Sequence, residues 1–324
     1  MTTINLSIVI PIYNVEKFVE ECVLSVLNQK KHSLTYEIIV VDDGSPDNSF
    51  NIVNSLAQKN TKIQIIRQEN KGLGGARNTG LQNANGDFIW FIDSDDWIAD
   101  NAFAQIEDLV KDTTLDGIRI SSADIINDIP VDKFQPTKFD RQIVSGYEIF
   151  NSSHWSPCVQ FTIYNRQFLI NKNLKQQEHL YHEDSEFSPR AYYYATRIYV
   201  LNQVLYYTRP NPNSITRSIN FKKNFDCIRV ATSLDSFINQ TVQNCHKKRY
   251  YNHIATILNS ALLNVEKMDL NTRQQFDNVM YQNKELFKNF KKSSALKYKI
   301  EGILFTTFPK YITSIYRILN KLYK

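Results

Sequence analysis

Residues 88–97 (FIWFIDSDDW) combine a short run of bulky apolar side chains with a cluster of carboxylates that follows at once. The run comes after the turn-forming pair Asn85-Gly86 and predicts a strand buried on both faces, as in a parallel sheet. The acids would then lie at the carboxyl end of the strand, the edge at which open α/β sheets bind ligands. A pair spaced as Asp93-x-Asp95 can hold a hard divalent cation and leave ligand positions for phosphate oxygens. The alternative is a solvated turn that caps the next helix, and this stretch alone does not decide between them.

Two earlier apolar runs end in a similar way. Residues 6–12 (LSIVIPI) lead into Tyr13-Asn14, and residues 36–41 (YEIIVV) stop at Asp42-Asp43. Apolar residues at helical spacing separate the runs, and strands that alternate with helices predict right-handed βαβ crossovers and a parallel sheet. We therefore expect Tyr13 and the acids of the later strands to meet on one edge. The Tyr13 ring could stack on a base, and the carboxylates after the second strand could accept the imide N–H of uracil. With the Asp93-x-Asp95 pair, these groups fit a pocket for a base, a ribose and a metal-bound diphosphate.

Four motifs in this order make a specific resemblance. SIVIPIYN (7–14), VVDDGSPDNS (40–49), NKGLGGARNTGL (70–81) and GDFIWFIDSDDW (86–97) together resemble the donor domain of the family 2 inverting glycosyltransferases. That family has the GT-A fold and uses nucleotide-diphosphate sugars. The resemblance implies an α/β chain with a Rossmann-like, mostly parallel central sheet flanked by helices, followed here by a helical C-terminal extension.

The resemblance also implies roles for individual residues. Those implied to bind the donor nucleotide are Pro11, Tyr13, Asp42, Asp43, Lys71, Gly72, Arg77, Ser94 and Arg209. Those implied to hold a divalent cation, Mg or Mn, are Asp93, Asp95 and, beside them, Asp96. Arg209 matches the first arginine of a Tyr-x-Arg-x-Arg pattern found in many relatives, whereas Asn211 stands where the second is common. This departure weakens the expectation of a two-arginine clamp on the diphosphate.

A further predicted strand, residues 63–66, is third in chain order. The glycines at 72, 74 and 75 follow this third strand and not the first, and their spacing differs from a dinucleotide fingerprint. We interpret them as a flexible loop that closes over the ligand, or simply as a turn.

Residues 182–187 (HEDSEF) form the next cluster of acids. Asp184 is a good N-cap for a helix that runs through Tyr194, and Glu183 adds favourable charge at its start. Transfer of a sugar with inversion needs a general base for the acceptor hydroxyl, and a carboxylate at a rigid helix start suits this role. The ED motif of the family falls here, so the resemblance implies that Asp184 is the base, with Glu183 as second choice.

The length and the charge of the chain limit the number of domains and the class of binding partner. The 324 residues are enough for one large or two modest domains, and we expect a glycosyltransferase domain at 1–220, with a donor half at 1–100 and an acceptor half at 101–220. The formal charge of +5 is too small to indicate nucleic-acid binding. The helical region 221–324 ends in a basic amphipathic helix after Pro309, which predicts either peripheral membrane contact or packing on the core or a partner subunit.

Taken with the resemblance, the sequence predicts a cytoplasmic inverting glycosyltransferase that either stays in solution or lies peripherally at the inner face of the cell membrane. Its partners would be a nucleotide-diphosphate sugar, most simply UDP-linked, and a glycan or lipid-linked acceptor of a cell-surface polysaccharide or lipopolysaccharide pathway. A sugar nucleotidyltransferase is a rival, although its phosphate loop would stand where Pro11 to Asn14 are found. A non-catalytic nucleotide-sugar-binding module is the other rival. The sugar, the acceptor and the oligomeric state stay open.

Overall fold

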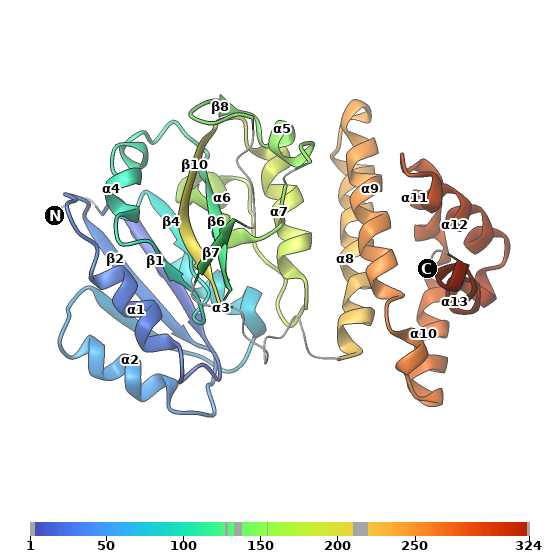
Figure 1. The fold of residues 1–324 in the computed structure, drawn as a ribbon, viewed down its shortest axis with the longest axis horizontal. Coiled ribbons are helices and arrows are strands. Elements are labelled where there is room, and N and C mark those ends of the chain that lie inside the picture. The colour runs from blue at the N-terminus through green and yellow to red at the C-terminus, as the bar shows by residue number, and fades with distance from the viewer. Residues whose placement is uncertain (1–3, 127–128, 133–137, 154, 210–219, 323–324) are drawn as a thin grey trace. The chain divides into compact units, whose positions relative to one another are not determined.

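The computed structural model describes residues 4–126, 129–132, 138–153, 155–209 and 220–322 (Figure 1). The chain divides into two compact units, Met1–Arg217 and Ser218–Lys324.

A single mixed sheet forms the centre of the N-terminal unit. Along its main path the strand order is β3-β2-β1-β4-β9-β6-β10-β5, and β7 and β8 pair with β6 and β10. Its strands are β1 (Leu6–Ile12), β2 (Tyr36–Asp42), β3 (Ile63–Arg67), β4 (Phe88–Phe91), β5 (Trp97–Ile98), β6 (Gly117–Ile126), β7 (Ile129–Asp132), β8 (Ile143–Val144), β9 (Thr162–Asn165) and β10 (Ile198–Thr208). The predicted mostly parallel sheet is confirmed.

The pairing directions bring particular strand ends together. β1 is parallel to β2 and β4, so the carboxyl ends of these three strands share an edge. β9 is antiparallel to both β4 and β6, which places its amino end on that same edge. β10 is parallel to β6 and also finishes there. We call this the acidic edge, because residues 42–43 and 93–96 follow its strands.

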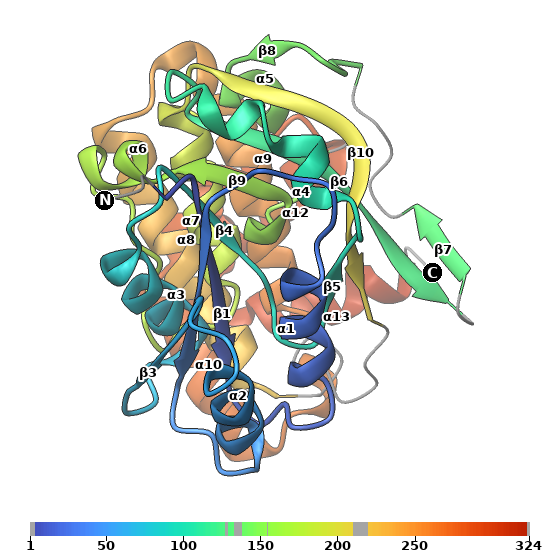
Figure 2. The ribbon, with the colours of Figure 1, turned by 90° about the vertical axis from the view of Figure 1, so that its left-hand side faces the viewer.

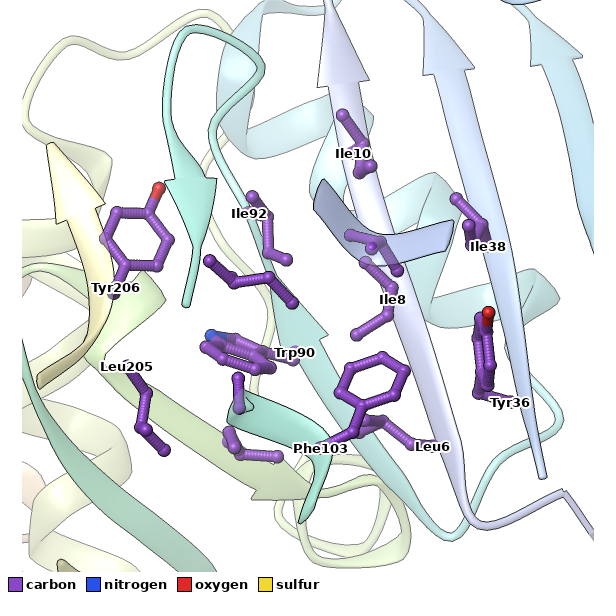
Figure 3. Close-up of a cluster of buried hydrophobic side chains, with 14 of the residues drawn as sticks. Leu6, Ile8, Ile10, Tyr36, Ile38, Trp90, Ile92, Phe103, Leu205 and Tyr206 are labelled. Atoms are coloured by element: carbon purple, nitrogen blue, oxygen red, sulfur yellow. The ribbon is translucent and has the colours of Figure 1, made fainter. Parts of the chain in front are cut away.

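Helices cover both faces of the sheet (Figure 2). They are α1 (Val19–Leu27), α2 (Ser49–Ala57), α3 (Gly72–Asn83), α4 (Ala102–Ile106), α5 (Gly146–Phe150), α6 (Arg166–Asn171) and α7 (Glu183–Tyr194), with 3-10 turns at Leu109–Lys111 and Val159–Phe161. Side chains of α1 and α4 join Ile8, Ile10 and Trp90 in the main apolar cluster (Figure 3). Successive strand side chains point to opposite faces, so Val9 faces the other side, where it meets α3.

The glycine stretch is part of a helix. Residues 72–75 make the first turn of α3, so the interpretation as a loop or turn was wrong. A Cβ at Gly74 would lie 2.5 Å from the Gln177 carbonyl oxygen, and one at Gly80 would lie 2.2 Å from a methyl carbon of Val9. These glycines therefore let α3 approach its neighbours closely, a requirement set by tertiary packing.

The C-terminal unit is helical. It contains α8 (Lys222–Gln240), α9 (Asn244–Ala261), α10 (Leu270–Gln282), α11 (Lys288–Lys292), α12 (Leu296–Thr307) and α13 (Ile312–Leu322), with 3-10 turns at Val265–Lys267, Lys284–Phe287 and Pro309–Tyr311. The rings of Phe287, Phe290 and Phe305 contact one another at centroid distances of 5.3 to 5.8 Å. Within the described residues, no helix has both the length and the apolar character needed to span a membrane.

Helix α13, for which membrane contact was one of the predicted alternatives, packs partly within this unit. Ile312, Thr313 and Tyr316 are buried, and the Thr313 hydroxyl donates a hydrogen bond to Asp277 of α10 at 2.6 Å. Packing on neighbouring helices therefore accounts for one side of α13. Tyr311 and Ile318, on the predicted apolar face, stay 61% and 62% exposed.

Glu301 of α12 is a buried acid in this unit. Its side chain is 1% exposed, its two carboxylate oxygens accept no hydrogen bond from the described residues, and the Lys297 ammonium lies 3.9 Å away. Burial raises the pKa of Glu301 from 4.5 to about 7, while Lys297 opposes the shift.

A Glu301→Gln substitution should stabilise the protein above pH 7. The folded state holds the Glu301 proton more tightly than the unfolded chain, so wild-type stability falls as the pH rises from 4.5 to about 7. We expect the variant to gain about 1–2 kcal/mol in the free energy of unfolding at pH 8, and less toward pH 5. Urea titrations at both pH values measure this difference. Glu285→Gln, at an exposed ion pair with Lys288, is the control; an equal gain there would contradict the assignment.

Candidate active site

Arg77 lies at the centre of a buried charge network. It comes from α3 and is 2% exposed. Its Nη2 donates to Asp93 Oδ1 at 2.6 Å, and its Nη1 donates to Glu183 Oε1 at 2.8 Å and to Gln176 Oε1 at 3.0 Å. One guanidinium therefore joins the acid after β4 to the first residue of α7. Charge-assisted hydrogen bonds of this kind are stronger and more directional than neutral ones.

The remaining bonds of Asp93 point into the protein. Its Oδ2 accepts a hydrogen bond from Gln160 Nε2 at 3.1 Å, just before β9. Its backbone N–H donates to the Tyr206 hydroxyl at 3.1 Å, and that hydroxyl donates to Asp96 Oδ2 at 2.8 Å. Figure 3 shows the Tyr206 hydroxyl directed toward the ends at which the neighbouring strands finish. Tyr206 therefore fixes the turn that carries the acids.

Asp96 is held entirely by the protein. Besides Tyr206, it accepts the Arg209 backbone N–H on Oδ1 at 2.9 Å. Burial raises the pKa of Asp96 well above its usual range, and the negative charges of Asp95 and Asp93 add to this effect. These bonds give Asp96 a structural role in the turn and make it a poor ligand for a cation.

Asp95 and Asp93 are both partly exposed, whereas Asp96 is buried and Ser94 is 7% exposed. Among the described residues, no three His, Cys, Asp or Glu side chains are grouped as a self-sufficient metal site requires. Mg²⁺, however, is commonly held by one or two carboxylates together with water and substrate phosphates. The donor set fits a cation of that kind, with Asp95 as the ligand and Asp93 turned toward Arg77.

Arg209 borders the same turn. Its Nε donates to the Asp95 carbonyl oxygen at 3.2 Å, and its guanidinium pairs with Glu21. The guanidinium also lies over the rings of Trp97 and Phe18, 4.7 and 5.2 Å from their centroids. Asn211, where the second arginine of the pattern would stand, lies outside the described residues.

Asp42 and Asp43 differ in what remains available to a ligand. Both oxygens of buried Asp42 are taken, one by the Ser45 N–H at 2.9 Å and the other by Arg67 Nε at 3.0 Å. Asp43 Oδ1 accepts from Gln68 Nε2 at 2.6 Å and from the Lys71 N–H at 2.8 Å. Its Oδ2 accepts nothing from the described part of the chain. Asp43 can therefore accept a hydrogen bond from a bound base.

Four other residues predicted to bind the donor lie at the ends of β1 and α3. Tyr13 follows β1 and is 50% exposed, so part of its side chain is open to a ligand, whereas Pro11 is buried inside β1. Lys71 precedes α3, and Gly72 adopts a φ of +75° that favours glycine. The Lys71 carbonyl oxygen accepts the His179 N–H at 2.8 Å, which links this end of α3 to the segment before α7.

The two acids of the ED pair have different surroundings. Glu183 is 7% exposed and bound to Arg77, and burial raises its pKa to about 7 against the opposing charge of Arg77. Asp184 is partly exposed, and among the described residues its Oδ1 accepts only the N–H of Ser185, at 2.6 Å. The prediction that Asp184 caps the helix is wrong, because α7 begins at Glu183 after His182, whose φ of 64° is left-handed. Asp184 thus stands in the first turn with a carboxylate that no described side chain occupies.

The structure joins several predicted residues through contacts at one edge. Asp43 holds the residue before α3, and Arg77 of α3 holds Asp93 and Glu183. Sequence reasoning missed three polar residues of this network: Gln160, Gln176 and Tyr206 carry no motif and become partners only through the fold. A cavity of about 510 Å³ lies elsewhere, beside residues that precede β4 and β6 and end β9, including Asp87, Asp116 and Asn165. It contains none of the predicted site residues.

The comparison with known families adds a decisive observation. The model of the family described as Glycosyl transferase family 2 matches residues 7–176, more than half of the chain. The protein belongs to glycosyl transferase family 2. The match covers all four ordered motifs and Gln160, and it ends at Gln176.

Individual family 2 relatives agree with this assignment. The uncharacterized glycosyltransferase EpsJ of Bacillus subtilis is 33% identical over 221 residues, which cover 65% of this chain and 62% of EpsJ. The S. aureus TarS fragment 1–349 in complex with UDP-GlcNAc superposes with a TM-score of 0.69 at 22% identity, covering 96% of this chain and 91% of that one. Mannosyltransferase PcManGT from Pyrobaculum calidifontis, solved with GDP-Man and Mn²⁺, gives 0.56 at 14% identity, covering 100% and 89%. The two structures establish the shared fold and confirm the predicted GT-A class.

Removal of the Arg77 charge should destabilise the fold. Arg77→Met leaves Asp93 and Glu183 without their cation, and breaking a buried ion pair costs about 3–5 kcal/mol. Urea unfolding should show a loss of that size, partly recovered when Asp93→Asn and Glu183→Gln are added. Lys111→Met, at an exposed ion pair, is the control and should leave the free energy of unfolding nearly unchanged. An Arg77→Met variant as stable as this control would contradict the network.

Proposed function

We propose that this protein is an inverting glycosyltransferase that moves a sugar from a UDP-linked donor to a hydroxyl group of a glycan or lipid-linked acceptor in cell-surface polysaccharide synthesis. The observation that carries the proposal is the ED pair. Glu183 is linked through Arg77 to Asp93 at the acidic edge, while the adjacent Asp184 keeps a partly exposed carboxylate. A base held at a fixed place relative to the donor is what an inverting transfer requires.

The donor half supports a uridine nucleotide. The exposed ring of Tyr13 can stack on the base, and Asp43 Oδ2 can accept the imide N–H of uracil. The TarS fragment, which shares the fold, binds UDP-GlcNAc. Arg209 and Lys71, at the borders of the site, supply positive charge for the diphosphate.

The transfer itself would use Asp184 as general base. The acceptor hydroxyl oxygen attacks the anomeric carbon as Asp184 takes its proton, the bond from that carbon to the diphosphate oxygen breaks, and UDP leaves with the electron pair. Attack opposite the leaving group turns an α-linked donor into a β-linked product through an oxocarbenium-like transition state. A divalent Mg or Mn ion, which Asp95 would hold, would supply positive charge to the leaving diphosphate. PcManGT, of the same fold, was solved with Mn²⁺.

An Asp184→Asn substitution should strongly lower turnover while leaving donor binding intact. Loss of a positioned base typically lowers the rate about 10²–10⁴-fold, and Asn keeps the shape of the side chain. We expect this loss in release of UDP from UDP-sugar with an acceptor, and an unchanged Kd for UDP by calorimetry. Asp108→Asn, 95% exposed on its side chain, is the matched control. Full turnover by Asp184→Asn would remove the proposed base.

An Asp43→Asn substitution should change the choice of base. The amide oxygen can keep the bond to the Lys71 N–H, which turns the amide NH₂ toward the position of Oδ2. Loss of a hydrogen bond to a charged group, with a donor now facing the uracil imide N–H, should weaken UDP binding by about tenfold or more. Cytosine offers an acceptor at that atom, so CDP should bind the variant better than UDP does. Unaltered preference for UDP would exclude Asp43 from base recognition, whatever the outcome for Asp184.

A further inference from the structure

Helix α12 (Leu296–Thr307) is apolar on two opposite sides. One side carries Gly302 and Phe305 into the aromatic core of the C-terminal unit. The other side exposes Leu296, Ile300 and Ile303, at 71%, 42% and 55%. Positions spaced by four and three residues form one stripe along a helix. We call these three residues the α12 stripe.

Further exposed apolar residues follow the α12 stripe in the chain. Phe308 is 51% and Tyr311 is 61% exposed in the turn between α12 and α13, and Ile318 of α13 is 62% exposed. Single exposed apolar residues are ordinary, whereas six within 23 positions, three of them in one stripe, are typical of a surface that meets an apolar partner.

The charge of this part of the chain is almost entirely positive. From Lys288 to Lys324 the sequence has nine Lys or Arg residues and a single acid, Glu301. That acid is 1% exposed, so it contributes little to the surface. Exposed positive residues stand within and around α12 and α13, namely Lys291, Lys292, Lys299, Lys310 and Arg317.

We propose that the α12 stripe and the surrounding lysines dock the protein on an anionic lipid bilayer. A helix that lies in a membrane interface buries an apolar stripe among the acyl chains and places basic residues against anionic headgroups. A second copy of this chain is a weaker occupant, because a symmetric contact would oppose the same positive residues and like charges repel. The sequence indicated membrane contact only for the helix after Pro309, which is α13. The structure adds α12 to this surface.

Sedimentation of the full-length protein with vesicles tests the docking surface. The wild type should sediment with vesicles of phosphatidylglycerol and phosphatidylcholine, much less with phosphatidylcholine alone, and less as salt is raised. The triple variant Leu296→Glu, Ile300→Glu, Ile303→Glu should partition about tenfold or more weakly. Leu270→Glu is the matched control, because Leu270 is 81% exposed in α10 of the same unit but lies outside the lysine-rich segment.

A second variant guards against loss of folding. Lys299→Glu with Lys310→Glu keeps the α12 stripe and should also weaken binding to the anionic vesicles about tenfold. Equal binding by wild type and triple variant would overturn the proposal. So would a wild-type dimer, in analytical ultracentrifugation, that ignores vesicles and dissociates in the triple variant. None of these measurements uses a sugar donor, so their result is independent of the proposed glycosyl transfer.

Discussion

The ion pairs of Arg77 hold the proposed site together. A buried guanidinium and two carboxylates are costly to desolvate, and they persist only when each charge is met by good geometry and further hydrogen bonds. Gln176 and Gln160 supply those bonds, one to Arg77 and the other to Asp93. The network therefore joins the strand end that carries the acids to the helix start that carries the proposed base. One shared interaction thus positions both the proposed donor-binding edge and the proposed base.

The sheet topology makes this meeting possible. Parallel pairing of β1, β2 and β4 brings three carboxyl ends to one edge, and the reversed strand β9 brings the preceding Gln160 to the same edge. Tyr206 arrives at the end of β10 and bonds the backbone of Asp93 and the carboxylate of Asp96. A residue more than 100 positions away in the sequence thus holds this turn in place. The acidic cluster looked like a local motif, but it is stabilised by a strand near the C-terminal end of the unit.

Much of this arrangement is readable from the sequence, and the rest depends on tertiary contacts. Buried strands, their parallel order and the four motifs follow from apolar runs and their spacing. The partners of Arg77 do not, because glutamines at 160 and 176 have no distinguishing local pattern. Gly74 looks like a loop residue until the neighbouring backbone is in place, and the packing role of Gly80 depends on its contact with Val9. The start of α7 depends on the left-handed His182, which propensity does not indicate, and the exposed stripe of α12 is visible only once the opposite stripe is packed.

The glycines of α3 have a further consequence. With no side chains to act as spacers at Gly74 and Gly80, the helix lies directly against its neighbours and cannot roll or slide by itself. Lys71, directly before the first residue of α3, donates its backbone N–H to Asp43, and the second turn of α3 carries Arg77. The separation between Asp43, proposed to bind the base, and the Arg77 guanidinium is therefore fixed by one rigid helical segment. A change of nucleotide preference in this fold would therefore have to come from substitutions of side chains that border the site. A displacement of α3 would break the ion pairs of Arg77.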